Sequence, residues 1–293
     1  MYTAQLKAHL QAVEQALPVY LPQIDRPWET VADGMHYACT DGGKRLRPVL
    51  LLEFCRLCGG DIKAALPFAC AIEMIHAYSL VHDDMPCMDN SPLRRGKPAV
   101  HKQYGEDMAL LVGDGLLTYA FETILSHAAT VPADRVLSAT LELAQSAGVE
   151  GMVGGQTIDL QSEGHTITIE QLNTLQSLKT GALLKAACVM GAILGGASAQ
   201  QKDAAEMFGK ELGRAFQIVD DILDATADAA TLGKPVGADA AAEKSTYVTL
   251  LGLDEARKTA QKHTEAALSA LDIFGDDAAS LRQLAQTLQD RCY

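Results

Sequence analysis

Apolar residues recur at intervals of three and four over most of the chain, the spacing that places them on one face of an α-helix. The run LQSLKTGALLKAACVMGAIL within residues 169–196 is a clear example. The pattern predicts helices with approximate bounds of 3–17, 28–39, 46–58, 62–84, 105–128, 133–161, 169–196, 199–226, 242–271 and 276–290. Alternating strand patterns are scarce, and the clearest one, residues 165–170, leads directly into a helix start.

The predicted helices belong to one domain. Thr168 with Gln171 matches the capping-box pattern that marks a helix start. No internal repeat, linker rich in serine or proline, or long run of like charge divides the sequence. Residues 1–293 are therefore predicted to form a single all-α domain, a bundle of roughly ten or more helices. Helix 169–196 is apolar around much of its circumference, which places it in the centre of the bundle.

Composition limits the possible partners. Hydrophobic residues make up 48% of the 293 positions, which is enough for a large core. The formal net charge of −13 argues against nucleic acid as a partner, because nucleic acid requires a broad basic surface. A phosphate site in such an acidic protein would have to be a local group of basic residues.

Cysteine usage and the N-terminus favour a reducing, cytoplasmic location. The seven cysteines are an odd number in a long chain, and the first residues carry no signal or transit pattern. Cys55 and Cys58 form a C-x-x-C, but without a second pair they are expected to be buried hydrophobic residues rather than zinc ligands. The apolar stretch 180–199 is interrupted by Lys185 and several glycines, so membrane insertion is not expected.

A first acidic motif lies in LVHDDMPCMDNSPLRRG, residues 80–96. Asp83 and Asp84 come at the predicted end of a helix that Pro86 terminates, and Asp89 can fold back towards them. Carboxylates at a helix C-terminus are unfavourable against the helix dipole, so the cluster indicates a bound cation. Taken alone, the cluster would also be compatible with a solvated acidic turn.

A second acidic motif favours the metal interpretation. In GRAFQIVDDILDAT, Asp220 and Asp224 share a helix face and Asp221 flanks them, in apolar surroundings. Like charges at this spacing are destabilising without a partner. Two such motifs could face each other across a helical bundle, and Mg²⁺ suits them because it prefers oxygen ligands and completes its shell with phosphate oxygens.

Basic residues suited to phosphate lie in several separate segments. In DGGKRLRP, residues 41–48, Lys44 and Arg47 are three apart and are expected on one face at a helix N-terminus, where backbone N–H groups bind anions. Lys179 interrupts an apolar helix, where an unpaired lysine is costly. Further candidates are Arg94, Arg95, Thr180, Lys234 and Lys244.

In their order, these segments resemble the bacterial-type trans-isoprenyl diphosphate synthases, and among them most closely the farnesyl diphosphate synthases (geranyltranstransferases). The resemblance runs from about residue 3 to the C-terminus and is carried by GGKRLRP, HDDMPCMDNSPLRRG, GMVGGQTIDL, KTGALL, FQIVDDILD, LGKPVGAD and KSTY. It implies the isoprenoid synthase fold, an all-α bundle around a large central cavity, and a homodimer. Asn90, Ser91 and Ala215 depart from the pattern of many relatives, but none of them replaces a proposed ligand.

The resemblance implies a prenyltransferase that condenses isopentenyl diphosphate with dimethylallyl or geranyl diphosphate and makes farnesyl diphosphate. Three Mg²⁺ ions, replaceable by Mn²⁺, would be held by Asp83, Asp84, Asp89, Asp220, Asp221 and Asp224. The allylic diphosphate would be bound by Arg94, Lys179, Thr180, Gln217, Lys234 and Lys244. Isopentenyl diphosphate would be bound by Gly43, Lys44, Arg47, His76 and Arg95. The implied catalytic set is Asp83, Asp84, Asp89, Arg94, Lys179, Asp220 and Lys234.

Product length is predicted from Tyr78 and Ser79, which precede Asp83 by five and four residues. Five residues of helix rise about 7.5 Å and helical side chains lean towards the N-terminus, so the Tyr78 ring could form the floor of a cavity for the growing tail. By resemblance, an aromatic residue here marks a C15 producer. The alternatives are a geranylgeranyl (C20) or geranyl (C10) product, with Tyr78 as a core residue that faces elsewhere.

Two rival functions share parts of this pattern. A terpene cyclase has the same fold and first motif, but it would normally carry an Asn/Ser/Glu-type second motif in place of DDILD. A regulatory subunit of a heteromeric synthase would be expected to have lost its aspartates, and all six are present here. Only the C-x-x-C points towards the subunit.

Overall fold

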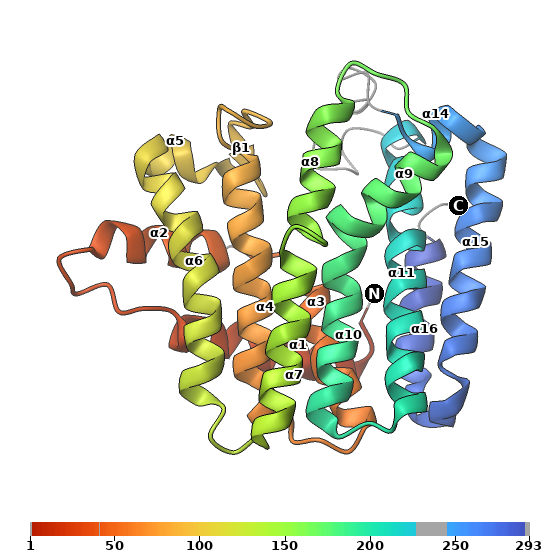
Figure 1. The fold of residues 1–293 in the computed structure, drawn as a ribbon, viewed down its shortest axis with the longest axis horizontal. Coiled ribbons are helices and arrows are strands. Elements are labelled where there is room, and N and C mark those ends of the chain that lie inside the picture. Colours follow the sequence, from red (N-terminus) through yellow and green to blue (C-terminus); the bar gives the residue numbers. More distant parts are fainter. Residues whose placement is uncertain (1, 41, 227–244, 291–293) are drawn as a thin grey trace.

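The computed structural model describes residues 2–40, 42–226 and 245–290, which form a helical bundle (Figure 1). In chain order the helices are α1 (Ala4–Tyr20), α2 (Glu29–Thr40), α3 (Leu46–Leu57), α4 (Ile62–Asp83), α5 (Val100–Tyr104), α6 (Glu106–His127), α7 (Ala133–Ala147), α8 (Met152–Ser162), α9 (Ile169–Gln176), α10 (Ala182–Gly195), α11 (Ala199–Thr226), α14 (Tyr247–Leu251), α15 (Leu253–Ala270) and α16 (Ala279–Gln289). A π-helix, η1 (Ser177–Gly181), joins α9 to α10, and a 3₁₀-helix, η2 (Asp272–Ala278), precedes α16. Strands β1 (Leu93–Arg94) and β2 (Lys97–Pro98) form one antiparallel hairpin.

Helix α10 is central, as its apolar circumference predicts. All of its residues except Lys185 and Ile193 are buried, and it packs against α3, α7 and α11. The approach to α3 is close enough that only glycine fits at position 191, where a Cβ would lie 2.2 Å from the carbonyl oxygen of Leu51. This close packing gives the polar end of the bundle a rigid support.

Helices α4 and α11 have almost the predicted bounds, and the capping box of Thr168 and Gln171 is confirmed at the start of α9. The prediction of one helix over 133–161 is wrong, because the chain breaks between α7 and α8. A tight turn there brings Gly151 so close to the preceding turn that a Cβ would lie 2.1 Å from the carbonyl oxygen of Ser146.

Two other predicted helices are also divided. The predicted helix over 169–196 contains the π-helix η1, and the one over 242–271 divides at Gly252, whose φ of 79° ends α14. Residues 242–244 lie outside the described part of the chain. The short helix α5 and the β1–β2 hairpin were not predicted, because each is too short to show a periodic pattern.

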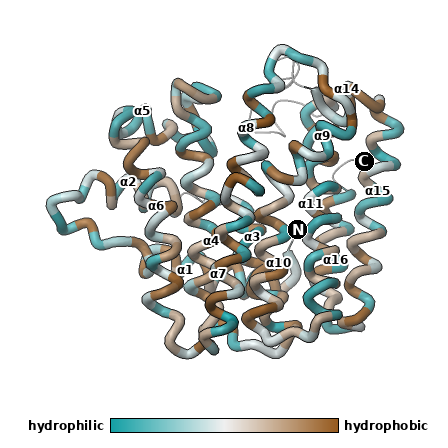
Figure 2. The backbone as a smooth tube through the Cα atoms, in the orientation of Figure 1, coloured by the Kyte–Doolittle hydropathy of each residue, from teal (hydrophilic) through white to brown (hydrophobic). Residues whose placement is uncertain are grey.

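Three helical segments are long and apolar enough to cross a membrane by length and composition: α4, α6 and Ile169–Gly195. By these criteria the expectation that the apolar stretch 180–199 falls short of a span does not hold for the longer segment that contains it. The apolar windows of α4 and Ile169–Gly195 are 72% and 67% buried in the bundle, where brown apolar stretches mark both (Figure 2). The window of α6 is only 39% buried, so much of its apolar surface faces outwards.

Candidate active site

Both acidic motifs lie where a long helix ends. Helix α4 ends at Asp83, and α11 ends at Thr226, shortly after Asp224. The two helices end at the same, upper end of the bundle in Figure 1, with α8 and α10 between them. The fold therefore brings two groups of carboxylates, far apart in sequence, to one end of the molecule.

In the first motif the chain folds back after Pro86, as the sequence indicates. The backbone N–H of Asp89 donates to the carbonyl oxygen of Asp83 at 2.9 Å, and the Asp83 carboxylate accepts a hydrogen bond from Gln156 Nε2 at 2.7 Å. This bond fixes the carboxylate of Asp83 against α8. The Asp89 side chain is exposed.

Asp84 has a different environment from its neighbours. It is 2% exposed, and its two carboxylate oxygens accept from Arg94 Nε, at 3.0 Å, and from Arg94 Nη2. A metal ion bound by Asp84 would share these oxygens with the Arg94 guanidinium, and the metal role of Asp84 stays a prediction. The pair positions Arg94 beside the motif and raises the pKa of the guanidinium against the lowering effect of burial.

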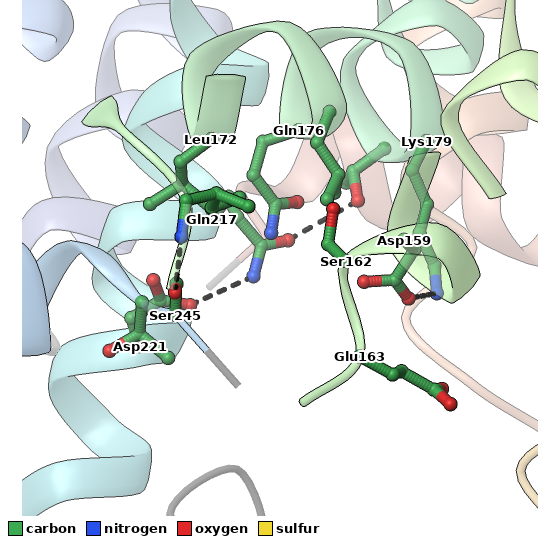
Figure 3. Close-up of a pocket in the computed structure, with 13 residues that line it drawn as sticks. Asp159, Ser162, Glu163, Leu172, Gln176, Lys179, Gln217, Asp221 and Ser245 are labelled. Carbon is green, nitrogen blue, oxygen red and sulfur yellow. Dashed lines mark hydrogen bonds and ion pairs between the residues drawn. The ribbon is translucent and has the colours of Figure 1, made fainter. Parts of the chain in front are cut away.

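In the second motif Asp221 is held from two sides, and Figure 3 shows the bond from Gln217. Its Oδ1 accepts from Gln217 Nε2 at 3.0 Å, and its Oδ2 accepts from the backbone N–H of Tyr247 at 2.9 Å. Gln217 Oε1 in turn accepts from the Thr180 hydroxyl at 3.2 Å. A hydrogen-bonded chain thus links the second motif to the π-helix, while Asp220 remains half-buried beside it.

The π-helix presents Lys179 to the site. An extra residue in one helical turn is a feature that often marks functional positions, because it turns side chains out of the regular register. Lys179 Nζ lies 2.5 Å from Asp159 Oδ2, so this partly buried lysine is paired (Figure 3). Helix α8 approaches so closely that a Cβ on Gly155 would lie 2.2 Å from Lys179 N.

Two cavities meet at Lys179 and Thr180, which line both. The smaller, of about 160 Å³, also contains Asp159, Gln217 and Asp221. The larger, of about 370 Å³, also contains Asp83, Arg47, His76, Tyr78 and Ser79, with Gln156 and apolar residues of α8. Each acidic motif therefore borders one of two adjoining cavities, and Lys179 lies where the two cavities meet.

Cationic groups converge on the larger cavity. Arg47 Nε is buried and has no hydrogen-bond partner among the described residues. Burial lowers the pKa of His76 well below 6.5, and nearby guanidinium groups lower it further. These groups belong to Arg47, Arg95, Arg45 and Arg94. A guanidinium with an unused buried donor, beside an imidazole that burial and then positive charge keep neutral, fits a bound polyanion.

The glycine turn before α3 is shaped by contacts that the sequence did not reveal. Lys44 precedes the helix, so the expectation that it shares a helical face with Arg47 is wrong. Its Nζ instead lies 5.3 Å from the centroid of the Phe216 ring on α11. Arg95 packs on Gly43, where a Cβ would lie 2.8 Å from its guanidinium carbon, and its Nη1 donates to the carbonyl oxygen of Gly42.

Arg45 is a site residue that sequence reasoning missed. It has a positive φ of 45° and is 3% exposed, and its guanidinium donates to Glu14, to Glu73 and to the carbonyl oxygen of Cys39, all at 2.6–2.7 Å. This buried network anchors the turn that carries Lys44 and leads to Arg47. No sequence signal separates Arg45 from its basic neighbours, because Glu14 and Glu73 are far away in the chain.

Gln156 and Asp159 were also missed, although both lie in the segment GMVGGQTIDL that carries part of the resemblance. Their spacing of three residues on α8 was the available signal, since it places them on one helical face. Lys234 and Lys244, predicted for the allylic diphosphate, lie outside the described residues.

The C-x-x-C is a packing feature in the described structure. Cys55 is buried and Cys58 is partly buried. Burial raises the pKa of Cys55 to about 12 and that of Cys58 to about 11. Both are therefore thiols of low reactivity at neutral pH, in agreement with their interpretation as hydrophobic residues.

The site chemistry suits a divalent cation that prefers oxygen ligands, because the donors are carboxylates near phosphate-binding cations. Within residues 2–40, 42–226 and 245–290, no three His, Cys, Asp or Glu side chains gather closely enough to hold a metal ion. Oxygen atoms from a substrate diphosphate and water would complete such a shell.

Comparison with known proteins extends these observations. A family model described as polyprenyl synthetase matches residues 29–285. The chain is 45% identical over 287 residues to a farnesyl diphosphate synthase of Geobacillus stearothermophilus, a match that covers 98% of this chain and 96% of the relative. It is 44% identical over 262 residues to a geranylgeranyl diphosphate synthase of Cyanophora paradoxa, covering 89% and 87% of the two chains. The apo structure of an FPP/GFPP synthase from Zymomonas mobilis matches with a TM-score of 0.86 at 39% identity and covers 97% of both chains.

An all-α bundle that gathers two aspartate motifs and a group of cations at one end defines a prenyltransferase acting on diphosphate substrates. The chain belongs to the polyprenyl synthetase family and is a trans-isoprenyl diphosphate synthase. The fold class and the family resemblance are thereby confirmed. The names of the relatives include both C15 and C20 synthases, so membership alone does not fix the product.

The lowered pKa of His76 predicts a pH effect on stability. In the unfolded chain His76 takes up a proton near pH 6.5, but in the folded protein it does so only at a lower pH. Because the unfolded state binds more protons in this window, the free energy of unfolding falls as the pH is lowered from about 6.5. We expect His76→Gln to decline less steeply than wild type between about pH 6.5 and pH 5, measured by urea unfolding without substrate. The exposed His165→Gln is the control and should keep the wild-type slope; a wild-type slope in His76→Gln would contradict the assignment.

Proposed function

We propose that this protein is a farnesyl diphosphate synthase. It would join isopentenyl diphosphate head to tail to dimethylallyl diphosphate, and then to the geranyl diphosphate that results, with release of diphosphate at each step. The observation that carries this proposal is the larger cavity, whose lining includes Asp83, Lys179, Arg47, His76 and Tyr78. One space thus contains charges for diphosphates and an aromatic wall for a hydrocarbon tail.

The allylic diphosphate would lie between the two acidic motifs. Arg94 beside Asp84, and Lys179 and Thr180 on the π-helix, provide donors to its oxygens, with Gln217 next to them. Bound Mg²⁺, held by aspartates of both motifs, would neutralise charge on the diphosphate. Asp83 is fixed for this task by Gln156. Arg94 and Lys179 stabilise the negative charge that develops when the allylic C–O bond breaks and its electron pair leaves with the diphosphate.

Isopentenyl diphosphate would occupy the cationic part of the cavity. Arg47 and Arg95 bind its diphosphate, and the backbone of Gly43 and the Lys44 ammonium lie in the same turn. The anchored turn directs the double bond of this substrate at the allylic cation, so that one new C–C bond forms. Loss of a proton to the released diphosphate then completes the product. Burial, and then the surrounding guanidinium groups, lower the pKa of His76 and keep its imidazole neutral.

Product length would be limited by Tyr78. The ring is 6% exposed and lies in the wall of the larger cavity, so it is a packed core residue that also faces the tail. Ser79, the next residue, lines the same cavity and donates to the carbonyl oxygen of His76 at 2.8 Å. These positions support a C15 product.

Activity should require Mg²⁺ or Mn²⁺ and should disappear with a chelator. Asp83→Ala and Asp220→Ala should each lower kcat on the order of a hundredfold or more, because the leaving group loses stabilisation. Asp203→Ala, an exposed aspartate on α11, is the matched control and should retain wild-type turnover. Steady-state rates with both diphosphate substrates measure the metal dependence and the effect of each variant. Near-normal turnover without metal would contradict the assignment of the aspartates as metal ligands.

Substitutions of the basic residues should affect the kinetics of the two substrates differently. Arg47→Ala should raise the KM for isopentenyl diphosphate about tenfold or more, because a charge-assisted hydrogen bond is lost. Lys179→Ala should act instead on the allylic substrate and on kcat. Lys185→Ala is the control, since Lys185 pairs with Glu142 at 2.7 Å and lines neither of the two cavities. The same loss for both substrates in Arg47→Ala and Lys179→Ala would refute the two-pocket arrangement.

Wild type should make mainly farnesyl diphosphate, and Tyr78→Ala should shift the product to C20 or longer, since removal of the ring leaves a cavity for the tail. Tyr78→Phe is the matched control and should keep the C15 product, because it retains the ring. Chromatography of the dephosphorylated products gives the answer. An active Tyr78→Ala variant that still stops at C15 would exclude Tyr78 as the floor, and a wild type that makes C20 would exclude the farnesyl assignment.

We also infer a homodimer that covers the exposed apolar face of α6. An open groove of about 730 Å³ between α2 and α6 is lined by Trp28, Val31 and Leu111, among others. Trp28 is 61% exposed, and Leu110, Leu111 and Leu125 of α6 are also exposed. Such a patch on a single chain is typical of a protein interface. A second copy of the chain, in the cytoplasm expected for this protein, would bury it.

Leu111→Glu should convert a dimer to monomers, because it places a charge in an apolar interface. Met207→Glu is the control: Met207 is also exposed, but it lies on α11. Sedimentation velocity at micromolar concentration distinguishes the two states. A wild-type monomer, or a Leu111→Glu variant that stays dimeric, would contradict this interface.

A further inference from the structure

His82, the residue before Asp83, packs its side chain against the backbone of the neighbouring helix α6. Its imidazole lies directly over Gly113 of α6, where a Cβ would come within 1.9 Å of Nε2 and 2.3 Å of Cδ2. The Nε2 atom is 3.1 Å from the carbonyl oxygen of Leu110. Because a carbonyl oxygen only accepts, Nε2 carries the hydrogen in this bond. The absence of a side chain at position 113 is therefore what allows the ring to reach α6.

The same ring contacts Tyr78. The centroids of the two rings are 5.9 Å apart and their planes are inclined at 77°, an edge-to-face arrangement. The Tyr78 side chain is only 6% exposed, so packing restrains the orientation of its ring. His82 is one turn after Tyr78 on α4, and it is held from the other side by α6. It therefore supports Tyr78 against displacement.

His82 also lines the larger cavity beside Tyr78 and Leu160. We propose that His82, seated on Gly113, is a second determinant of product length: it forms part of the wall around the hydrocarbon tail and holds Tyr78 in place. This inference rests on the proposed function, because it concerns the tail of the allylic product in the same cavity. His82 is a positioning residue here and takes no part in bond breaking.

A side chain at position 113 has one foreseeable effect. The methyl group of an alanine at position 113 would overlap the His82 imidazole. The Nε2 side of the ring would then have to move away from α6 and would lose its hydrogen bond to the carbonyl oxygen of Leu110. The ring already lines the cavity, so it would move into the tail space. Gly113→Ala should therefore shorten the product and raise the C10-to-C15 ratio about tenfold, since one methylene in an apolar pocket discriminates by that order. His82→Ala removes the wall and the support of Tyr78, so it should lengthen the product beyond that of wild type.

The test is a double-mutant cycle read out as product distribution at matched turnover. Wild type, Gly113→Ala, His82→Ala and the double variant are incubated with both diphosphate substrates, and the dephosphorylated products are separated by chromatography. If Gly113 acts through the imidazole, Gly113→Ala shifts the product when His82 is present and has no effect in the His82→Ala background. Gly115→Ala on the same helix is the matched control, because its Cβ would meet only side-chain atoms, the nearest at 3.2 Å on flexible Met35.

Three outcomes overturn the proposal. They are a wild-type product ratio in folded Gly113→Ala, the same shift from Gly113→Ala in both backgrounds, and an unchanged product from active His82→Ala. If Gly113→Ala fails to fold in a thermal-melt control, the His82→Ala product still decides. The product of the wild-type protein tests the proposed C15 function separately. If wild type makes a C20 product, the farnesyl assignment is excluded. The product shifts of the variants relative to wild type still test the role of His82 and Gly113.

Discussion

Like charges concentrated at one end of a helical bundle are the constraint on which the rest of this site depends. Helices α4 and α11 both carry aspartates where they end, against their own dipoles. Guanidinium groups gather around His76 nearby and help to lower the pKa of its imidazole. Part of this charge is balanced within the protein, by the pairs Asp84–Arg94 and Lys179–Asp159. A diphosphate with its metal ions carries both signs of charge, so it can offset the remainder on each side.

Holding such charges in place requires a stiff support. The buried helix α10 packs against its neighbours with glycine at the closest approach, and it continues directly into the π-helix that presents Lys179. The buried network of Arg45 fixes the turn before α3 in a similar way. Each polar side chain is thus attached to a backbone that the apolar core restrains, which keeps the lost entropy of ordering low when substrates bind.

In the proposed function, product length depends on a different part of the same cavity. The wall formed by Tyr78, His82 and Leu160 is aromatic or apolar, whereas Gln156 of α8 lines the same cavity and donates to Asp83. In the proposed function, substitutions at Tyr78, His82 or Leu160 change the volume for the tail and leave the aspartates and arginines of the site in the sequence. This separation gives a physical reason why relatives of nearly equal identity carry the names of C15 and C20 synthases.

The sequence by itself determined most of the helical segments, the position of both acidic motifs and the fold-back after Pro86, because periodicity, proline and short-range spacing are local properties; it missed α5 and the divisions at Gly151, Ser177 and Gly252. It also determined the family, since the motifs occur in a specific order. Only the tertiary structure decided that Asp84 is held by Arg94, that Arg45 is buried, that Lys44 precedes its helix and that His82 rests on Gly113. These features depend on side chains and backbone that meet across helices, such as Arg45 with Glu73, and no local pattern records which distant residue will lie within bonding distance.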